Sequence, residues 1–321
     1  MTISKEFRRK DGGIKFNFAP ANEEELKECL SDPLWRICSG ALYKIIIKGD
    51  DGEDGLVMPF IPNRAQKRLL KALWHRNVIL KARQLGFTTL VCIVWLDTAL
   101  FSENMRCGII AQDREAAEVI FRDKVKFAYE NLPEELKAAM PLARDSASEL
   151  LFAHNNSSIR VATSMRSGTI HRLHISEFGK ICAKYPDKAK EVITGSIPAV
   201  PKSGILIIES TAEGRDGEFY DITMRAKALY DSKSELTVRD YKFHFFAWWD
   251  APEYEMPVDS VKLTDKDLAY FERIESQINQ PISPEKRAWY IATRDADFSG
   301  SEEKMWQEYP STPEEAFQQS T

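Results

Sequence analysis

The apolar residues of the chain fall into two patterns, short continuous runs and longer stretches with helical spacing. The short runs predict buried strands at 42–48, 56–60, 77–81, 105–111, 150–153, 159–162, 170–176, 204–208 and 241–249. The longer stretches predict helices at 23–30, 88–102, 114–131, 188–193, 264–277 and 284–294. From residue 77 to residue 208 the two kinds of element alternate. This alternation indicates an α/β protein with a mostly parallel central sheet that is covered by helices on both faces.

Changes in this pattern divide the chain into three parts. Residues 1–59 form an N-terminal extension with one helix and two strands, which are joined by a turn-rich stretch at 49–55. Residues 60–237 form the α/β core. Residues 238–321 begin with an aromatic strand and continue into helices, so we interpret them as a smaller lid or linker subdomain.

The segment KARQLGFTTL, residues 81–90, connects a predicted strand to a predicted helix. Gly86 allows close approach of the backbone, the helix start offers free N–H groups, and the Thr88 hydroxyl can bind Mg²⁺, as in a phosphate-binding loop. Phe87 stands where the usual loop has lysine, and Lys81 and Arg83 are the two cations that could replace it. The alternative is an ordinary strand-to-helix turn. We expect Phe87 to pack into the core beneath the helix start.

Polar residues follow two other predicted strands, and ligands of parallel sheets bind at the carboxyl ends of strands. Glu177 can polarise an attacking water, and Ser176 stands where ATPases commonly carry a second acid, which a hydroxyl can replace by holding Mg²⁺ through a water. Glu177 could instead be a charge at a helix N-terminus. Ser210 and Thr211 follow the strand at 204–208 and could sense the terminal phosphate.

Composition limits the partners that the chain can bind. The net charge is −5, so nucleic-acid contact must be local. Two basic clusters are candidates, the first at helical spacing (Arg64, Lys67, Arg68, Lys71) and the second at residues 7–10, although both could be solvated surface. No apolar stretch approaches the roughly 20 residues of a membrane span, and Asp97 interrupts the longest. The five widely spaced cysteines predict reduced thiols that are mostly buried.

Five segments, taken in order, resemble the ATPase domain of the large terminase subunit, the DNA-packaging motor of tailed bacteriophages and prophages. They are KARQLGFTT, LHISEFGK, IIESTAEGRDGEFY, FHFFAWWDAPEY and WQEYPSTPEEAF, and the resemblance runs from about Phe60 to the last residue. It implies a P-loop NTPase fold of the ASCE, RecA-like kind, a three-layer sandwich with a small lid or linker subdomain. It also implies ATP and Mg²⁺ as cofactors.

The resemblance assigns roles to single residues. Gln66 matches the residue that reads adenine, although it could instead be a surface residue. The phosphate-binding loop would comprise Lys81, Arg83, Gln84, Gly86, Thr88 and Thr89, and Mg²⁺ would be held by Thr88, Ser176 and Glu177. Lys81 and the base Glu177 would act in catalysis, with Ser210 and Thr211 in the coupling motif. Arg166 resembles the arginine that a neighbouring subunit inserts at the transferred phosphoryl group, with Arg160 and Arg172 as rivals.

The same resemblance implies the biological setting. The chain would hydrolyse ATP to translocate double-stranded DNA into a procapsid, in the cytoplasm of the infected bacterial host and away from membranes. Its partners would be the portal protein, the small terminase subunit and further copies of itself in a ring on the portal, and the chain alone would be a monomer. The aspartate cluster of the family's RNase-H-like nuclease is missing, so we expect no DNA cleavage. The alternatives are a helicase-like nucleic-acid ATPase and a nucleotide-binding scaffold that does not hydrolyse ATP.

Overall fold

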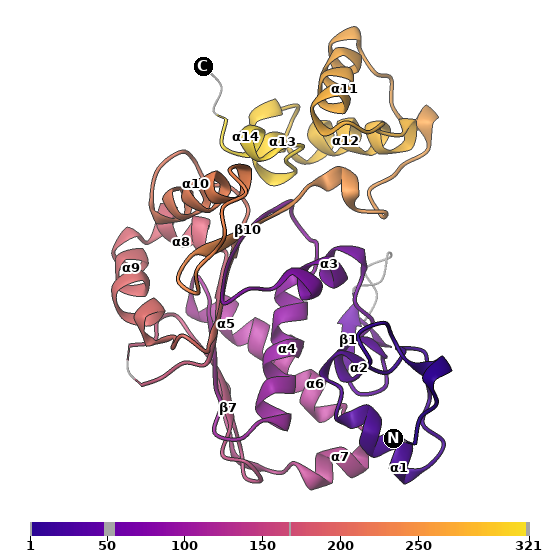
Figure 1. The fold of residues 1–321 in the computed structure, drawn as a ribbon. Coiled ribbons are helices and arrows are strands. Elements are labelled where there is room, and N and C mark those ends of the chain that lie inside the picture. Colours follow the sequence, from indigo (N-terminus) through magenta and orange to yellow (C-terminus); the bar gives the residue numbers. More distant parts are fainter. Residues whose placement is uncertain (1, 48–54, 167, 319–321) are drawn as a thin grey trace. The chain divides into compact units, whose positions relative to one another are not determined.

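The computed structural model describes residues 2–47, 55–166 and 168–318, so the turn predicted at 49–55 lies outside the described residues except for Gly55. Helices and strands alternate along the chain (Figure 1). The chain forms two compact units, which are unit 1 (2–66, 86–174 and 195–204) and unit 2 (67–85, 175–194 and 205–318). The predicted division at residues 59 and 237 follows other boundaries and stays a prediction.

The N-terminal part of unit 1 contains a 3-10 turn, two short helices and a two-stranded sheet. The elements are η1 (Lys5–Phe7), α1 (Glu23–Leu30), α2 (Pro33–Cys38), β1 (Lys44–Ile47) and β2 (Leu56–Pro59). Helix α1 has the predicted bounds because the Asn22 side chain accepts a hydrogen bond from the Glu25 N–H and so caps its first turn. Strands β1 and β2 are antiparallel, as a hairpin requires.

Unit 1 contributes four strands of the main sheet, in the order β4 (Arg106–Ile110), β7 (Ser158–Ala162), β6 (Glu149–Phe152) and β5 (Leu142–Asp145). Strands β4 and β7 are parallel, whereas β6 is antiparallel to both β7 and β5. The strands predicted at 150–153 and 159–162 are therefore confirmed as β6 and β7, which form an antiparallel hairpin. The edge strand β5 was not predicted, because its exposed sequence LARD has no continuous apolar run.

The helices of unit 1 are α4 (Phe87–Phe101), α5 (Arg114–Ile120), α6 (Phe127–Glu130) and α7 (Glu134–Ala139). Asp113 caps α5 by accepting a hydrogen bond from the Ala116 N–H at 2.8 Å. The helix predicted over 114–131 is present almost throughout, but a π-helical segment, η2 (Phe121–Lys126), joins α5 to α6. Such segments are rare and frequently occur at functional sites.

Unit 2 contains three parallel strands in the order β10 (Tyr241–Phe246), β3 (Arg76–Lys81) and β9 (Ile205–Ser210). Strand β8 (Arg172–Ser176) crosses the boundary, and only Ile175 and Ser176 belong to unit 2. The main sheet is thus a mixed sheet of eight strands, mostly parallel as predicted. Strand β10 ends before the predicted residue 249, because a 3-10 turn, η5 (Trp248–Asp250), follows it.

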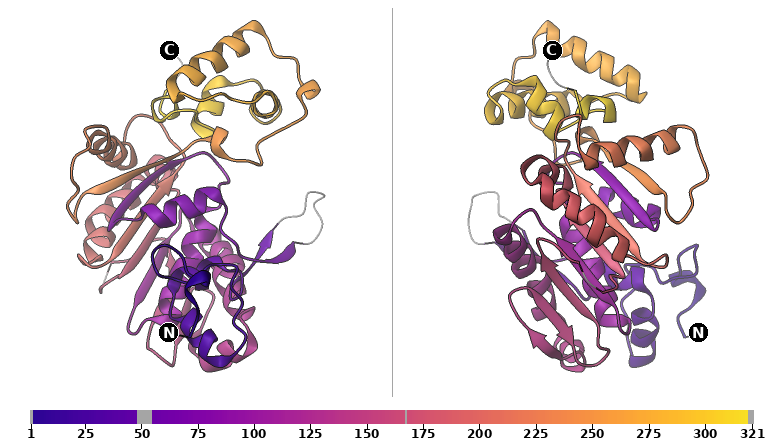
Figure 2. Two further views of the ribbon diagram at one scale, coloured as in Figure 1. Left: turned by 45° about the vertical axis from the view of Figure 1, so that its right-hand side comes forward. Right: turned by 90° about the vertical axis from the view of Figure 1, so that its left-hand side faces the viewer.

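Helices of unit 2 cover the strands and form a separate C-terminal group. Helices α8 (Phe178–Lys184) and α10 (Glu218–Asp231) pack against β9, β3 and β10 (Figure 2). Between β8 and β9 the chain also forms α9 (Pro186–Glu191), a short π-helical segment, η3 (Val192–Ser196), and a 3-10 turn, η4 (Ile197–Ala199). The C-terminal group begins with a 3-10 turn, η6 (Val258–Ser260), and continues as α11 (Asp265–Ile278), α12 (Pro284–Asp297), α13 (Glu302–Glu308) and α14 (Pro313–Ala316).

Helix α3 (Arg64–Ala72) crosses the boundary between the units. No helix among the described residues is long and apolar enough to span a bilayer. The described cysteines are all free thiols, four of them buried and Cys182 half-buried, as predicted.

A buried ion pair explains why Asp97 interrupts the apolar sequence of α4. The Arg36 guanidinium donates two hydrogen bonds to the Asp97 carboxylate, at 2.9 and 2.8 Å, and Tyr43 donates a third. Arg36 also lies over the Phe101 ring, 4.1 Å from its centroid. Both charged side chains are almost fully buried. The N-terminal extension is therefore held to α4 by a charge pair in the core of unit 1.

We expect Asp97→Asn to destabilise the protein by about 3–5 kcal/mol, because the substitution leaves the Arg36 charge buried without its counter-ion. Urea unfolding measures the free energy of unfolding. The control is Glu23→Gln, which removes an exposed pair with Lys27 and should change stability by less than about 1 kcal/mol. An Asp97→Asn protein as stable as the control would contradict the structural role of this pair.

Candidate nucleotide-binding site

The candidate phosphate loop contains two residues with left-handed backbone. Gln84 has a φ of +60° and Gly86 a φ of +79°, and Gly86 immediately precedes α4. A Cβ atom at Gly86 would lie 2.8 Å from the Gln66 amide nitrogen, so a side chain there would collide. Glycine is thus required both for the turn and for the close approach of Gln66.

Gln66 is buried and holds this glycine in place. Its amide nitrogen donates to the Gly86 carbonyl at 2.8 Å, and its amide oxygen accepts from the Asn63 N–H at 2.8 Å. The alternative of a surface residue is wrong, since only 5% of Gln66 is exposed. Its role at adenine stays a prediction, and its contact with the loop is a finding.

The start of α4 confirms the prediction for Phe87 and adds a cation. Phe87 is 1% exposed and packs in the core, so it cannot contribute to a phosphate site. The Thr89 hydroxyl accepts a hydrogen bond from the Lys124 ammonium at 2.7 Å. Lys124 lies in the π-helical segment η2 and places a cation beside the first turn of α4. This contact could not be predicted from the sequence, because 35 residues separate Lys124 from Thr89.

In unit 2, Lys81 binds two carboxylates at the ends of neighbouring strands. Its ammonium lies 3.0 Å from Glu177 Oε1 and 3.3 Å from Glu209 Oε2. The Lys81 side chain is 7% exposed and that of Glu209 is fully buried. Burial lowers the pKa of Lys81, but the charges of Glu209 and Glu177 outweigh it, so the pKa lies above its usual value and Lys81 is a cation at neutral pH.

Glu177 follows β8 in a left-handed backbone conformation, with a φ of +52°. It occupies the capping position of α8, but its side chain makes no capping hydrogen bond. The carboxylate instead faces Lys81, with Lys180 3.7 Å away and the Ser210 hydroxyl 3.5 Å away. A non-glycine residue in this conformation costs energy, and such residues cluster at functional sites. The alternative, in which Glu177 serves only as a negative charge at the N-terminus of a helix, therefore does not account for its contacts.

Glu209 is a site residue that the sequence analysis missed. Its Oε1 accepts a hydrogen bond from the Ser176 hydroxyl at 2.8 Å, and both residues are buried. The available signal was a single acidic residue inside the apolar strand ILIIES, since a buried charge requires a partner. Ser176 is thus bound to a carboxylate of the adjacent strand.

The end of β9 packs closely against α8. Ser210 and Thr211 are buried, and a Cβ atom at Gly179 would lie 2.8 Å from the Ser210 hydroxyl and 2.9 Å from the Thr211 carbonyl. Helix α8 can approach β9 this closely only because residue 179 is glycine.

Arg83 is held by its backbone rather than by its side chain. Its N–H donates to the Glu308 carbonyl at 2.8 Å, and its carbonyl accepts from the Tyr254 hydroxyl at 2.6 Å. The guanidinium is about half exposed, and its contact with the Glu308 carboxylate is long, at 3.9 Å. Arg83 can therefore turn towards a phosphate without losing a strong ion pair.

The three arginines proposed for the inserted position differ in exposure. Arg166 lies in an exposed part of the loop between β7 and β8. Arg160 is half-buried and lines a cavity of about 380 Å³ with Arg106 and Arg144. Arg172 donates to the His171 carbonyl, and burial lowers its pKa. Arg166 is the most accessible of the three to a neighbouring molecule.

The two basic clusters are partly used within the protein. Arg68 pairs with Asp250 at 2.6 Å and lies over the Phe246 ring, whereas Lys67 and Lys71 are exposed. Arg8 pairs with Glu28 and Arg9 with Asp32, in support of a structural role for residues 7–10.

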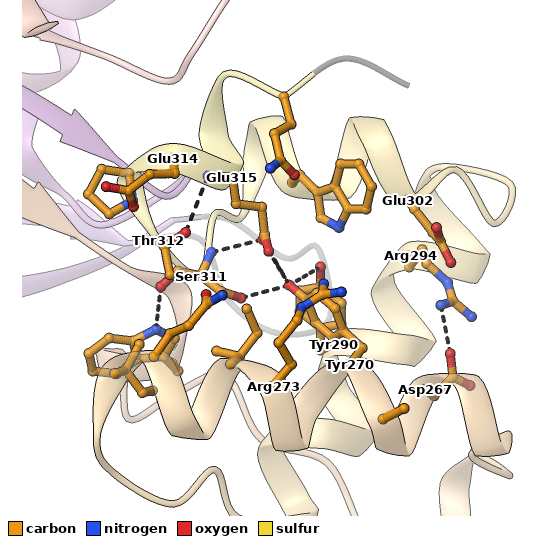
Figure 3. Close-up of a pocket in the computed structure, with 18 of the residues that line it drawn as sticks. Asp267, Tyr270, Arg273, Tyr290, Arg294, Glu302, Ser311, Thr312, Glu314 and Glu315 are labelled. Carbon is orange, nitrogen blue, oxygen red and sulfur yellow. Dashed lines mark hydrogen bonds and ion pairs between the residues drawn. The ribbon is translucent and has the colours of Figure 1, made fainter. Parts of the chain in front are cut away.

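A cavity of about 1000 Å³ lies among the C-terminal helices, and no residue assigned from the sequence lines it. Figure 3 shows Glu315 pointing at Tyr270, whose hydroxyl lies 2.8 Å from each carboxylate oxygen. Ser311 donates its N–H to the same carboxylate at 3.1 Å. Burial raises the pKa of Glu315 to about 7, although these donors oppose the shift.

The fold of the chain is similar to that of solved P-loop ATPase structures. The chain has the α/β fold of P-loop ATPases, in agreement with the sequence analysis. No protein-family model and no curated protein matches the chain.

Two similar structures are large terminases. The ATPase domain of the Thermus phage P74-26 large terminase is 17% identical with a TM-score of 0.50, over 78% of this chain and 94% of that domain. The large terminase of bacteriophage HK97 is 16% identical with a TM-score of 0.54, over 86% of this chain and 54% of that protein. The chain thus spans about half the length of the HK97 protein.

We expect Glu315→Gln to change how stability depends on pH. Because the pKa rises from 4.5 to about 7 on folding, the carboxyl group favours the fold below about pH 4.5, and this contribution is lost as the pH rises through 7. The amide is neutral at every pH, so the variant should gain about 2–3 kcal/mol relative to wild type between pH 5 and pH 8.

Urea unfolding at the two pH values measures this difference. Glu314→Gln is the matched control, because Glu314 is exposed and adjacent in sequence, and its difference from wild type should not vary with pH. A constant difference for Glu315→Gln would show that this carboxyl group is ionised at neutral pH.

Proposed function

We propose that this chain is the ATP-hydrolysing motor domain of a viral DNA-packaging terminase. The observation that carries the proposal is the cluster of Lys81, Glu177 and Glu209 at the carboxyl ends of strands, in a chain with the P-loop ATPase fold. The likeness of the chain to two large terminases supports the packaging role. No observation favours the helicase-like ATPase or the scaffold over this function.

In the proposed reaction, the loop from Lys81 to Thr89 binds the phosphates of ATP. Gly86 precedes α4, and the dipole of this helix favours an anion at its N-terminus. Phe87 supplies no charge, so the cation comes from Lys81, Arg83 or Lys124. Of these, Arg83 has the weakest ion pair to give up.

Glu177 acts as the general base that orients and deprotonates the attacking water. Its carboxylate is three-quarters buried but still accessible, whereas Glu209 is fully buried. The proton would pass to a Glu177 Oε atom once Lys81 has moved away, because a carboxylate bound to an ammonium is a poor proton acceptor.

The residues at the strand ends fit Mg²⁺. This ion prefers oxygen ligands, and the hydroxyl of Ser176 and the carboxylates of Glu177 and Glu209 offer them. The role that the sequence assigns to Thr88 stays a prediction. When bound with ATP, Mg²⁺ would neutralise charge on the phosphates.

The proposed substrate of the motor is double-stranded DNA, gripped through its phosphates by a ring of such chains on a portal protein, with a small terminase subunit as a further partner. The exposed Lys67 and Lys71 are candidate DNA contacts. DNA affinity should then fall steeply as salt rises.

We expect Glu177→Gln to reduce kcat for ATP hydrolysis by about 10²–10⁴-fold, because the amide cannot accept the proton from water. The dissociation constant for ATP should change little. Steady-state phosphate release and equilibrium titration with a fluorescent ATP analogue measure the two quantities. Lys180→Gln is the control, since Lys180 lies near Glu177 but has no proposed role in proton transfer. A Glu177→Gln protein with normal kcat would remove Glu177 as the base.

We expect Arg166→Ala to lower ATP turnover by about a thousandfold, as an arginine supplied to the transferred phosphoryl group does. Arg166 acts on the neighbouring copy, so mixing Arg166→Ala with Glu177→Gln protein at high concentration should restore part of the activity. Arg172→Ala serves as the comparison, because its guanidinium is bound within its own chain. Absence of any recovery on mixing would argue against action between subunits.

A further inference from the structure

Strand β8 ends in Ser176, at the position where ATPases of this fold commonly carry an acidic residue. A hydroxyl brings no charge to a magnesium shell, so the strand lacks a carboxylate. Here the Ser176 hydroxyl donates to Glu209 Oε1 at 2.8 Å. The neighbouring strand β9 therefore places a buried carboxylate against the position that β8 leaves uncharged.

Strand register explains why Glu209 reaches this point. Glu209 is paired with Ile79 on the parallel strand β3. Side chains alternate along a strand, so Ile79 and Lys81 lie on one face of the sheet, and Glu209 lies on that face beside them. The distance of 3.3 Å between the Lys81 ammonium and Glu209 Oε2 follows from this register.

The two carboxylates already bind a cation, which is the ammonium of Lys81. The Glu209 side chain is fully buried, and the Glu177 side chain is only partly exposed to solvent. Both carboxylates therefore depend on a nearby positive charge. If Lys81 left the pair to contact a phosphate, two buried negative charges would remain. A divalent cation that arrives with the nucleotide can compensate both.

We propose that Glu209 provides the magnesium-site carboxylate that Ser176 cannot, and that Lys81 serves as its counter-ion until nucleotide and Mg²⁺ bind. This inference rests on the proposed ATPase function for its biological meaning. The affinity of Glu177 and Glu209 for a metal ion can be measured whether or not the chain hydrolyses ATP.

The test removes the internal cation and measures metal binding without nucleotide. Lys81→Met keeps the length and the apolar stem of the side chain but not its charge. With Mn²⁺ as the probe, electron paramagnetic resonance should show a stoichiometric site in Lys81→Met that is about ten to a hundred times tighter than any site in wild type. The double variant Lys81→Met/Glu209→Gln should lose this gain.

The control is Lys81→Met/Glu308→Gln, which removes another largely buried carboxylate of the same unit and should retain the gain. The inference is overturned if folded Lys81→Met binds Mn²⁺ no better than wild type, or if Glu209→Gln leaves the new site intact.

A second pair of variants keeps the inference testable if Lys81→Met does not fold. Glu209→Ser should weaken Mn²⁺ binding in the presence of ADP by about tenfold or more, and Ser176→Asp/Glu209→Ser should restore it by returning the carboxylate to β8. Unchanged Mn²⁺ affinity in Glu209→Ser, or no recovery in the double variant, overturns the inference.

The two proposals fail in different ways. A wild-type chain that hydrolyses no ATP, together with Glu209-dependent Mn²⁺ binding in Lys81→Met, would refute the proposed function and support the role of Glu209. Normal hydrolysis together with Mn²⁺ binding that is independent of Glu209 would refute only the inference.

Discussion

The ion pairs of Lys81 with Glu177 and Glu209 are the interaction on which the rest of the candidate site depends. Two carboxylates from adjacent strand ends share one ammonium in a largely buried position. Coulomb energies are large where water is excluded, so the site is stable only when a cation is present. The position of Glu177, the burial of Glu209 and the orientation of Ser176 all follow from this constraint.

In the candidate loop, the residues that hold the backbone in place differ from the residues that could bind a phosphate. Phe87 and Gln66 fix the loop through packing and hydrogen bonds, which leaves charge neutralisation to side chains outside the standard lysine position. Gly179 allows α8 to approach β9 closely, so the helix that follows Glu177 lies directly against Ser210 and Thr211. The departure of this loop from the usual phosphate-binding sequence, with Phe87 at the lysine position, is thus compatible with an ordered site.

Much of the fold could be predicted from the sequence, since buried parallel strands have continuous apolar runs and α1 and α5 have clear capping residues. The edge strand β5 has no such run, and the helices α13 and α14 are too short to show a period. In the site, Lys81, Gly86 and Glu177 could be found because they lie in contiguous motifs. Glu209 and Lys124 could not be assigned, because their partners, Lys81 and Thr89, are distant from them in sequence. The strand register brings Glu209 to Lys81, and the π-helical segment brings Lys124 to Thr89.

The pair of Arg36 and Asp97 has a consequence for how this protein can be dissected. Helix α4, which begins at the candidate phosphate loop, carries Asp97 in its middle, and Arg36 of α2 neutralises this carboxylate. A recombinant fragment trimmed to the predicted core at residue 60 would contain the carboxylate without its guanidinium. The N-terminal extension and α4 therefore fold together. A recombinant fragment whose first residue is chosen from the positions of the motifs alone would separate them.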